Sequence, residues 1–213
     1  MRKPLRRQML LVLMKDNRPA SKDRCQNIVL IGFMGTGKTT IGKIASERLG
    51  LAFVDTDDLI VEREGQPIPQ IFERVGEAGF RKIETDVLRG LAGEGGKIIA
   101  TGGGIITQPE NIRLLQELGF VVWLAATVET IFERVSMNRD RPLLYTEDPL
   151  QTITDLLAER EAQYEAASDL RVETDNFHAD EITHGIAASA GVASGLTKVV
   201  LTLSKASAIC IAS

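Results

Sequence analysis

The sequence predicts a single domain of the doubly wound α/β class, in which a parallel β-sheet carries helices on both faces. Its 213 residues are enough for one such domain of ordinary size and too few for two. From residue 27 to about 189, short apolar runs alternate with segments of helical periodicity, and a glycine-rich turn joins the first run to the first helical segment. Strands that alternate with helices pair in parallel through right-handed crossovers. In such a fold we expect ligands at the carboxyl ends of the strands.

The predicted strands are short apolar runs, and the predicted helices carry apolar residues at helical spacing. Strands are expected over 28–31, 51–54, 97–100, 120–124 and 170–172. Helices are expected over 38–49, 57–64, 68–75 and 76–92, from 109, over 127–136 and 150–167, and from 179. Between the helices at 127–136 and 150–167 lies a polar segment that contains Pro142, and we expect it to form a loop.

The composition is that of a globular protein without membrane-spanning segments. Hydrophobic residues make up 44% and charged residues 25% of the chain, which excludes a disordered or collagen-like chain. The longest apolar runs, such as 121–126, are far shorter than the roughly 20 residues that a membrane span needs. Cys25 and Cys210 have neither zinc-binding nor disulfide spacing. Isolated thiols of this kind are typical of a reducing compartment, so we expect a cytoplasmic protein.

The charge is distributed unevenly along the chain. Residues 1–24 carry a net charge of +6 and residues 190–213 one of +2, so that with a total of −4 the intervening residues 25–189 carry −12. An acidic body argues against a nucleic-acid groove, and we expect neither nucleic acid nor membranes as partners. A phosphate ligand must therefore be bound by a few placed cations and by backbone amides.

Two terminal extensions flank the predicted domain at 26–186. The extension at 1–25 is basic and contains the apolar segment 9–14, which is shorter than the core of a secretion signal and is followed by no small-residue cleavage site. We expect a disordered extension, or an upstream start codon, in place of a signal peptide. The extension at 187–213 has no acidic and no aromatic residue. We expect it to be poorly ordered, while an additional strand or a partner-binding segment stays open.

A phosphate-binding loop is the strongest functional signal in the chain. The segment GFMGTGKTT, residues 32–40, matches the pattern G-x-x-x-x-G-K-[ST] and stands between a strand and a helix, the context that this motif requires. Its glycines let backbone amides turn toward phosphate groups, and the helix N-terminus adds positive potential. Lys38 is expected to reach the β- and γ-phosphates of a nucleotide, and the Thr39 hydroxyl to bind Mg²⁺. The loop residues expected to bind ATP are Gly35, Thr36, Gly37, Lys38, Thr39 and Thr40.

Two carboxylates follow the second strand, at the edge where ligands are expected. Asp55 and Asp57 stand two residues apart, so one can hold the water shell of Mg²⁺ while the other takes or orients a hydroxyl proton. Asp57 is also suited to cap the helix that begins near Asp58. Farther along, three consecutive glycines at 102–104 follow the third strand and indicate that bare backbone approaches a ligand.

Several arginines are candidates for binding anionic groups. Arg81 suits a substrate carboxylate, although Glu84 three residues later makes a surface ion pair an equal alternative. Arg134, Arg139 and Arg141 stand at the entrance of the polar segment or within it. They are candidates for stabilising the charge of a transferring phosphoryl group.

Taken together, these motifs resemble those of shikimate kinases. GFMGTGKTT, the triplet DTD at 55–57, GEAGFRKIE, ATGGG and RPLL occur in the order and spacing of that family, over about 27–185. The resemblance implies a three-layer P-loop kinase fold of the nucleoside-monophosphate kinase type, with a five-stranded parallel sheet in the order 2-3-1-4-5 and a lid over about 137–148. It also implies phosphorylation of the 3-hydroxyl of shikimate with ATP and Mg²⁺, a step of aromatic amino-acid biosynthesis through chorismate. We expect the protein to be a monomer.

The resemblance further implies the roles of individual residues. Asp57 is expected to bind the shikimate hydroxyls and to assist proton removal, with Lys38 and Arg141 as the other catalytic residues. Arg81 is expected to bind the substrate carboxylate together with Arg160, which by its local sequence alone would be interpreted as a solvated residue.

Other positions complete the implied site. The residues expected to line the substrate pocket are Phe80, Gly103 and Gly104. Arg134 is expected beside the adenine and Arg141 at the phosphates. Asp55 is expected to bind Mg²⁺ through water, next to Thr39, and Glu84 to orient Arg81.

Two other classes of function stay open on the residues alone. One is a kinase for another small hydroxy acid, such as gluconate, or for a nucleoside monophosphate. The other is a nucleotide-binding regulator without catalysis, against which the joint presence of Lys38, Thr39, Asp57 and Arg81 argues.

Overall fold

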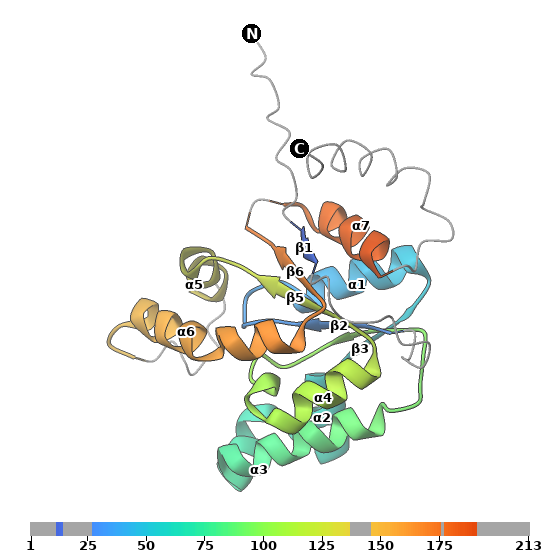
Figure 1. Ribbon diagram of the computed structural model, residues 1–213. Helices are drawn as coiled ribbons and strands as arrows, with labels where there is room; N and C mark the ends of the chain where they lie inside the picture. The colour runs from blue at the N-terminus through green and yellow to red at the C-terminus, as the bar shows by residue number, and fades with distance from the viewer. Residues whose placement is uncertain (1–11, 15–26, 137–145, 176, 191–213) are drawn as a thin grey trace.

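A six-stranded β-sheet between two layers of helices forms the described part of the chain (Figure 1). The computed structural model describes residues 12–14, 27–136, 146–175 and 177–190. The strands are β1 Val12–Met14, β2 Ile28–Ile31, β3 Ala52–Asp55, β4 Lys97–Ala100, β5 Phe120–Ala125 and β6 Leu170–Glu173. Their order across the sheet is β1-β6-β5-β2-β4-β3. Strands β2 to β6 pair in parallel. If β2 is counted as the first strand, their order is 2-3-1-4-5, which confirms the prediction.

The helices connect the strands at the predicted places. They are α1 Lys38–Leu49, α2 Thr56–Glu64, α3 Ile68–Gly90, α4 Pro109–Leu118, α5 Val128–Ser136, α6 Pro149–Ala167 and α7 Ala179–Ser189, with a short 3₁₀ helix, η1, at Ile105–Thr107. We predicted separate helices over 68–75 and 76–92, and the structure joins them as α3 with a kink at Gly76. Gly76 has a φ of 67°, a left-handed conformation that glycine adopts without steric cost, so the two predicted helices meet there.

The central strand β2 is buried on both faces. Val29 and Ile31 belong to an apolar cluster with side chains of α4 and α6, whereas Ile28 and Leu30 belong to a second cluster with side chains of α1 and α7. Successive residues of a strand point to opposite faces, so an uninterrupted apolar run fits a sheet that is covered on both sides. This burial anchors the strand and thereby the loop that follows it.

The edge of the sheet differs from the prediction. β1 comes from the extension at 1–25, for which we expected no ordered structure, and it pairs antiparallel with β6. An added edge strand satisfies backbone groups that β6 would otherwise leave unpaired. The sequence carries no local signal for this pairing, because the partner strand lies near the other end of the domain. At that end, α7 continues to Ser189, beyond the predicted boundary at 186.

The carboxyl ends of the parallel strands lie along one edge of the sheet, where the loops form the candidate site. β2 leads into the glycine-rich loop at 32–37, β3 ends at Asp55, β4 leads into the glycines at 102–104, and β6 is followed by Thr174. This is the edge at which ligands were expected. Among the described helices, none has the length and apolar character needed to cross a membrane.

Candidate active site

The glycine-rich loop is shaped by the backbone conformations of its glycines. Gly32 has a φ of 143°, and a Cβ at this position would lie 2.3 Å from the carbonyl oxygen of Leu124. Gly37 has a φ of 93° and directly precedes α1. Both positions therefore require glycine, and the loop delivers its backbone amides and the α1 N-terminus to the same place.

Lys38 folds back over the loop from the first turn of α1. Its Nζ donates hydrogen bonds to the carbonyl oxygens of Gly32, at 2.7 Å, and Phe33, at 2.8 Å. The side chain is only 9% exposed. The loop thus holds a positive charge in place before any anion binds, which is the preorganisation that phosphate binding needs.

Asp55 connects the metal-binding candidate Thr39 with the start of α2. Its Oδ2 accepts a hydrogen bond from Thr39 Oγ1 at 2.9 Å, and its Oδ1 accepts one from the backbone N–H of Asp57 at 3.0 Å. Asp55 is therefore the N-cap of α2, and the alternative that Asp57 caps this helix is wrong. Asp57 instead lies in the first turn, within 2.9 Å of the point where a Cβ of Gly102 would be.

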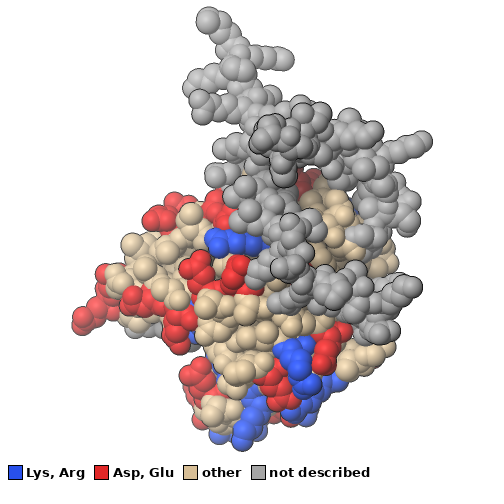
Figure 2. Space-filling model, in the orientation of Figure 1, with Lys and Arg blue, Asp and Glu red and all other residues tan. Residues whose placement is uncertain are grey.

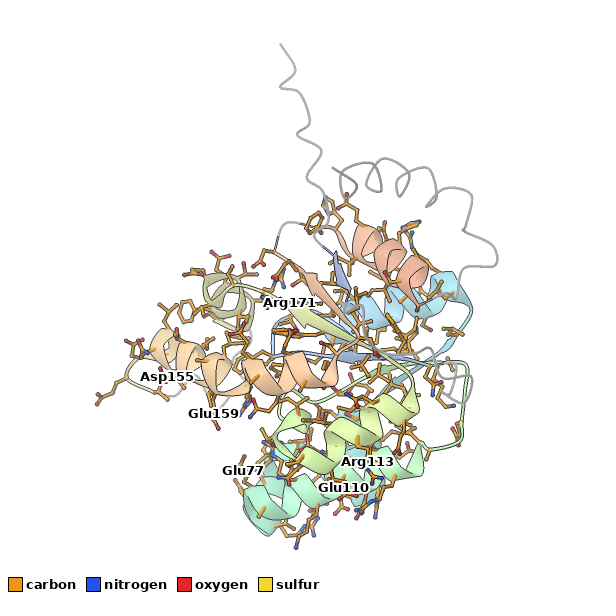
Figure 3. The ribbon with its side chains drawn as sticks, viewed as in Figure 1. Glu77, Glu110, Arg113, Asp155, Glu159 and Arg171 are labelled. Carbon is orange, nitrogen blue, oxygen red and sulfur yellow. The ribbon has the colours of Figure 1, made fainter. Side chains whose placement is uncertain are left out.

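The Arg81 guanidinium lies between two carboxylates of α3. Its Nη1 donates to Glu84 Oε2 at 2.6 Å, and its Nη2 donates to Glu77 Oε1 at 3.0 Å. The side chains of Arg81 and Glu84 are 11% and 1% exposed, so this is a buried pair and not the surface pair that was the alternative. Glu77, labelled on α3 in Figure 3, is 69% exposed.

Burial and charge act against each other in this pair. Burial raises the pKa of Glu84, although the positive charge of Arg81 partly offsets this effect. Burial also disfavours the charge of Arg81, but the attraction and hydrogen bonds of Glu84 and Glu77 together outweigh it and raise the Arg81 pKa above its ordinary value. The guanidinium therefore stays charged and is fixed in direction.

The glycines at 102–104 bring bare backbone against these charged groups. A Cβ at Gly102 would lie 2.9 Å from both Asp57 Oδ1 and Glu84 Oε1, and one at Gly104 would lie 2.6 Å from Arg81 Nη1. Side chains at these positions would displace the carboxylates and the guanidinium. The triplet therefore lets the loop after β4 run directly along Asp57 and Arg81, and the approach of its backbone to a ligand stays a prediction.

Arg160 and Phe80 lie around the same loop. Arg160, half-buried on α6, has its Cζ 5.7 Å from the centre of the Phe33 ring, and its Nε is buried without a hydrogen-bond partner. It lies one turn before Tyr164, whose hydroxyl reaches the Gly103 carbonyl. Phe80 is 4% exposed and stacks on Phe72 with 4.2 Å between the ring centres. The structure thus brings Arg160 to the site although its local sequence carries no such signal.

Arg134 joins the glycine-rich loop to the end of β6. Its Nη1 donates to the Gly35 carbonyl oxygen at 3.2 Å, and its Nη2 donates to the Thr174 carbonyl oxygen at 2.9 Å. The predicted partners Arg139 and Arg141, with most of the predicted lid at 137–148, lie outside the described residues.

A cavity of about 480 Å³ opens at this edge of the sheet. Its lining residues are Met34, Gly35, Thr36, Gly37, Lys38, Thr39, Thr40, Ile41, Asp55, Asp57, Thr101, Gly103, Arg134, Thr174, Phe177, Ala179 and Ile182. Every loop residue predicted to bind ATP is in this lining, as are Asp55, Asp57 and Arg134. Of the described residues predicted to bind substrate, Phe80, Arg81, Gly104 and Arg160 do not line the cavity. Arg81 lies against Gly104, Phe80 lies under the Arg81 guanidinium, and Arg160 lies over Phe33 of the loop after β2. Asp57 and Gly103, which are also predicted to bind substrate, line the cavity.

The comparisons with known proteins agree with this geometry. A sequence model of shikimate kinases matches residues 34–190. The chain belongs to the shikimate kinase family. The shikimate kinase of Geobacter sulfurreducens is 46% identical over 162 residues, which cover 76% of this chain and 89% of that protein. That of Synechococcus elongatus is 45% identical over 157 residues, or 74% of this chain and 82% of that protein.

Solved structures of the family have the same fold. The shikimate kinase of Acinetobacter baumannii, determined in complex with shikimate, superimposes with a TM-score of 0.72 at 41% identity, over 77% of this chain and 92% of that one. The shikimate kinase of Aquifex aeolicus superimposes with a TM-score of 0.68 at 36% identity, over 77% and 95% of the two chains. The three-layer P-loop kinase fold is thereby confirmed.

Among the residues of this shikimate kinase site that sequence reasoning missed are Tyr164, Thr174 and Phe177. Tyr164 is fully buried on α6, and its hydroxyl donates to the Gly103 carbonyl oxygen at 2.6 Å. It follows Arg160 by four residues, a spacing that places both on one helix face and was the overlooked signal. Thr174 and Phe177 line the cavity, and their position after β6, at the ligand edge, could have indicated them.

Proposed function

We propose that this chain transfers the γ-phosphoryl group of ATP to the 3-hydroxyl of shikimate, giving shikimate 3-phosphate and ADP. The observation that carries the proposal is the shared position of Asp57 and Gly103. Both line the nucleotide cavity, Asp57 lies against Gly102, and Gly103 adjoins Gly104, which lies against the Arg81 guanidinium. A phosphoryl donor in the cavity and an anionic acceptor beside it would therefore meet at Asp57.

On the donor side, the proposal assigns the triphosphate to the loop at 35–40. Lys38 would exchange its bonds to the loop carbonyls for the β- and γ-phosphates, so that its charge offsets the charge that develops in the transition state. Arg134, anchored on Gly35 and Thr174, would lie beside the adenine. Family membership supports ATP as the co-substrate.

Mg²⁺ fits the oxygen groups at the cavity. Thr39 Oγ1 and Asp55 Oδ2 lie 2.9 Å apart and both residues line the cavity. The described residues contain no cluster of three metal-ligating His, Cys, Asp or Glu side chains, so the protein would supply few ligands. Mg²⁺ keeps most of its water and binds substrate phosphates, which matches a hydroxyl with a carboxylate behind it. When bound, the ion would neutralise phosphate charge.

On the acceptor side, Arg81 and Arg160 would bind the shikimate carboxylate. Glu84 binds Nη1 of Arg81, and the exposed Glu77 binds Nη2. A substrate carboxylate could replace Glu77 at Nη2. Asp57 would accept the proton of the attacking shikimate hydroxyl. The hydroxyl oxygen bonds to the γ-phosphorus while the bond between the γ-phosphorus and ADP breaks. Because little else is covalent, alignment of the two reactants provides most of the catalysis.

We further propose that the enzyme acts as a cytoplasmic monomer. The reaction consumes ATP, which the cytoplasm supplies. Sedimentation or light scattering of the purified protein tests the oligomeric state.

The proposed function is tested by ADP release with shikimate, gluconate and AMP as acceptors at equal concentration. We expect turnover with shikimate to exceed the other two, because an open-chain gluconate cannot present a ring-fixed carboxylate and hydroxyl together. Arg81→Lys removes the planar fork and should cost roughly 2–5 kcal/mol of apparent shikimate binding, with little change for ATP.

Arg113→Lys is the matched control, since Arg113 is 69% exposed on α4 (Figure 3). It should behave as wild type. Equal or faster turnover of gluconate or AMP would refute the substrate, and unimpaired shikimate binding in Arg81→Lys would refute the role of that residue.

A further inference from the structure

Tyr164 is held from two sides in the interior of the protein. It is fully buried on α6, and its ring stacks on Trp123 with 5.6 Å between the ring centres and 15° between the planes. Its hydroxyl donates a hydrogen bond of 2.6 Å to the carbonyl oxygen of Gly103. Burial raises the pKa of the phenol above its ordinary value, although Arg160 and Arg81 oppose this, so the hydroxyl keeps its proton and can donate.

The acceptor of this bond is the middle carbonyl of the glycine triplet. The carbonyl of Gly102 accepts from the N–H of Ile105 at 3.3 Å, and that of Gly104 accepts from Thr107 at 3.1 Å, so these two are fixed by the following 3₁₀ helix. The carbonyl of Gly103 is instead bound by a side chain from a helix 61 residues farther along the chain. Its direction therefore depends on the packing of α6.

The direction of this carbonyl sets the direction of the next amide. No cis peptide bond occurs among the described residues. In a trans peptide the C=O of Gly103 and the N–H of Gly104 point to opposite sides of the chain. Glycine has few steric barriers to rotation, so a Gly–Gly peptide can turn over easily unless a hydrogen bond holds it. The Tyr164 hydroxyl supplies such a bond.

We propose that Tyr164 is a positioning residue that holds the Gly103–Gly104 peptide so that the Gly104 N–H faces the shikimate acceptor. The inference rests on the proposed function. Arg160 lies one turn before Tyr164 on α6, and Gly104 lies directly against the Arg81 guanidinium. The same helix thus presents one carboxylate-binding arginine and orients the backbone next to the other. In this proposal Tyr164 acts through the peptide and not by contact with either substrate.

The test is Tyr164→Phe, which removes the hydroxyl and keeps the ring against Trp123. We expect the KM for shikimate to rise roughly five- to tenfold, which corresponds to the loss of one hydrogen bond. The reason is that the substrate must then order the Gly103–Gly104 peptide itself. The KM for ATP should change much less, because the loop at 35–40 is shaped by its own glycines and by the Lys38 bonds to Gly32 and Phe33. The value of kcat should change less than the KM for shikimate, since bound substrate restores the peptide direction.

Ser46→Ala is the matched control. The Ser46 hydroxyl donates to the Leu51 carbonyl oxygen at the same 2.6 Å, at the far end of α1. This variant loses an equivalent bond and should alter neither KM. Thermal unfolding of both variants shows whether they are folded and how much general stability each bond contributes.

The outcomes separate the two proposals. Failure of the wild-type protein to phosphorylate shikimate would overturn the proposed function and this inference with it. If the wild type is active and Tyr164→Phe has an unchanged KM for shikimate, or an equal rise in both KM values, the inference alone is overturned. A rise confined to shikimate supports it.

Discussion

In the absence of nucleotide, the Lys38 side chain is hydrogen-bonded to its own loop. Its Nζ donates to two carbonyl oxygens, at 2.7 and 2.8 Å, so the ammonium is already desolvated where a phosphate would bind. Exchange of these carbonyls for phosphate oxygens replaces neutral acceptors by charged ones, which form stronger hydrogen bonds.

We predict that Lys38→Ala lowers kcat about 10²-fold or more without unfolding the protein, because one charge-stabilising group is lost. Steady-state ADP release and circular dichroism measure the two effects. Lys43→Ala, on the exposed side of the same helix, serves as the control and should keep normal turnover. A folded Lys38→Ala protein with near wild-type kcat would contradict the role.

The raised pKa of Glu84 predicts that the stability of the protein depends on pH. Burial raises its pKa above the ordinary value of 4.5, even with Arg81 beside it. A raised folded-state pKa means that folding favours the protonated form, so the contribution to stability is complete below the unfolded pKa and is lost as the pH rises through the folded pKa. Glu84→Gln does not titrate and is free of this loss.

We therefore expect the free energy of unfolding of Glu84→Gln, relative to wild type, to increase from about pH 4 to about pH 7. Urea denaturation at both pH values measures it. Glu110→Gln, which alters an exposed pair with Arg89, should show no such increase. A relative stability that is constant or falls with pH would show that the Arg81 charge outweighs burial.

The α6 helix links two parts of the candidate site. Its start is fixed by Asp148, whose side chain accepts from the N–H of Gln151 at 3.0 Å, and this start follows the predicted lid segment directly. Farther along, Arg160 and Tyr164 lie one turn apart and reach the glycine triplet and its neighbours. The same helix therefore begins at the predicted lid and contacts the acceptor side farther along.

At the same scale, the sequence predicts that Arg141 acts in the transition state from within the lid. Arg141→Ala should lower kcat more than it weakens ATP binding, because the contact strengthens as charge develops on the transferring group. Turnover assays and calorimetric titration of ATP give the two values. An equally steep loss of ATP affinity would make Arg141 an ordinary ground-state contact.

Over the whole molecule, the charge is arranged so that an acidic protein can bind anions. Residues 25–189 carry a net charge of −12. In Figure 2 acidic side chains predominate over the α5 and α6 end, while both signs mix over α3 and α4. The cations proposed to bind phosphate and carboxylate are instead held near backbone and buried carboxylates, where water screens them less.

A chain shortened to residues 25–190 tests what the extensions contribute. We expect it to keep its turnover, because every described residue of the candidate site lies within this range. It also lacks β1, so the outer edge of β6 becomes open to pairing, and we expect self-association that increases with concentration. Kinetics and light scattering measure these effects.

A chain of residues 1–190, which keeps β1, is the control and should not associate more than the full chain. Loss of activity in the folded 25–190 chain would show that an extension completes the site.

The sequence by itself determined the parts of this protein that depend on neighbouring residues. The strand and helix order follows from apolar periodicity, and the phosphate loop follows from glycines whose conformations are set within a few residues of Lys38. Asp57 and the glycine triplet were also found, because the ends of parallel strands meet at one edge of a sheet. Family resemblance, carried by these same local motifs, extended the prediction to the substrate.

Only the tertiary structure decided the contacts between distant segments. Arg160 and Tyr164 reach the glycine triplet because α6 packs against η1, and no local pattern specifies that packing. Arg81 and Glu84 form a buried pair and not a surface pair because other segments cover this part of α3. The choice of Asp55 over Asp57 as the helix cap depends on backbone angles that both residues could have adopted. Such outcomes depend on the free energy of the whole packed chain, to which each local signal contributes only a small part.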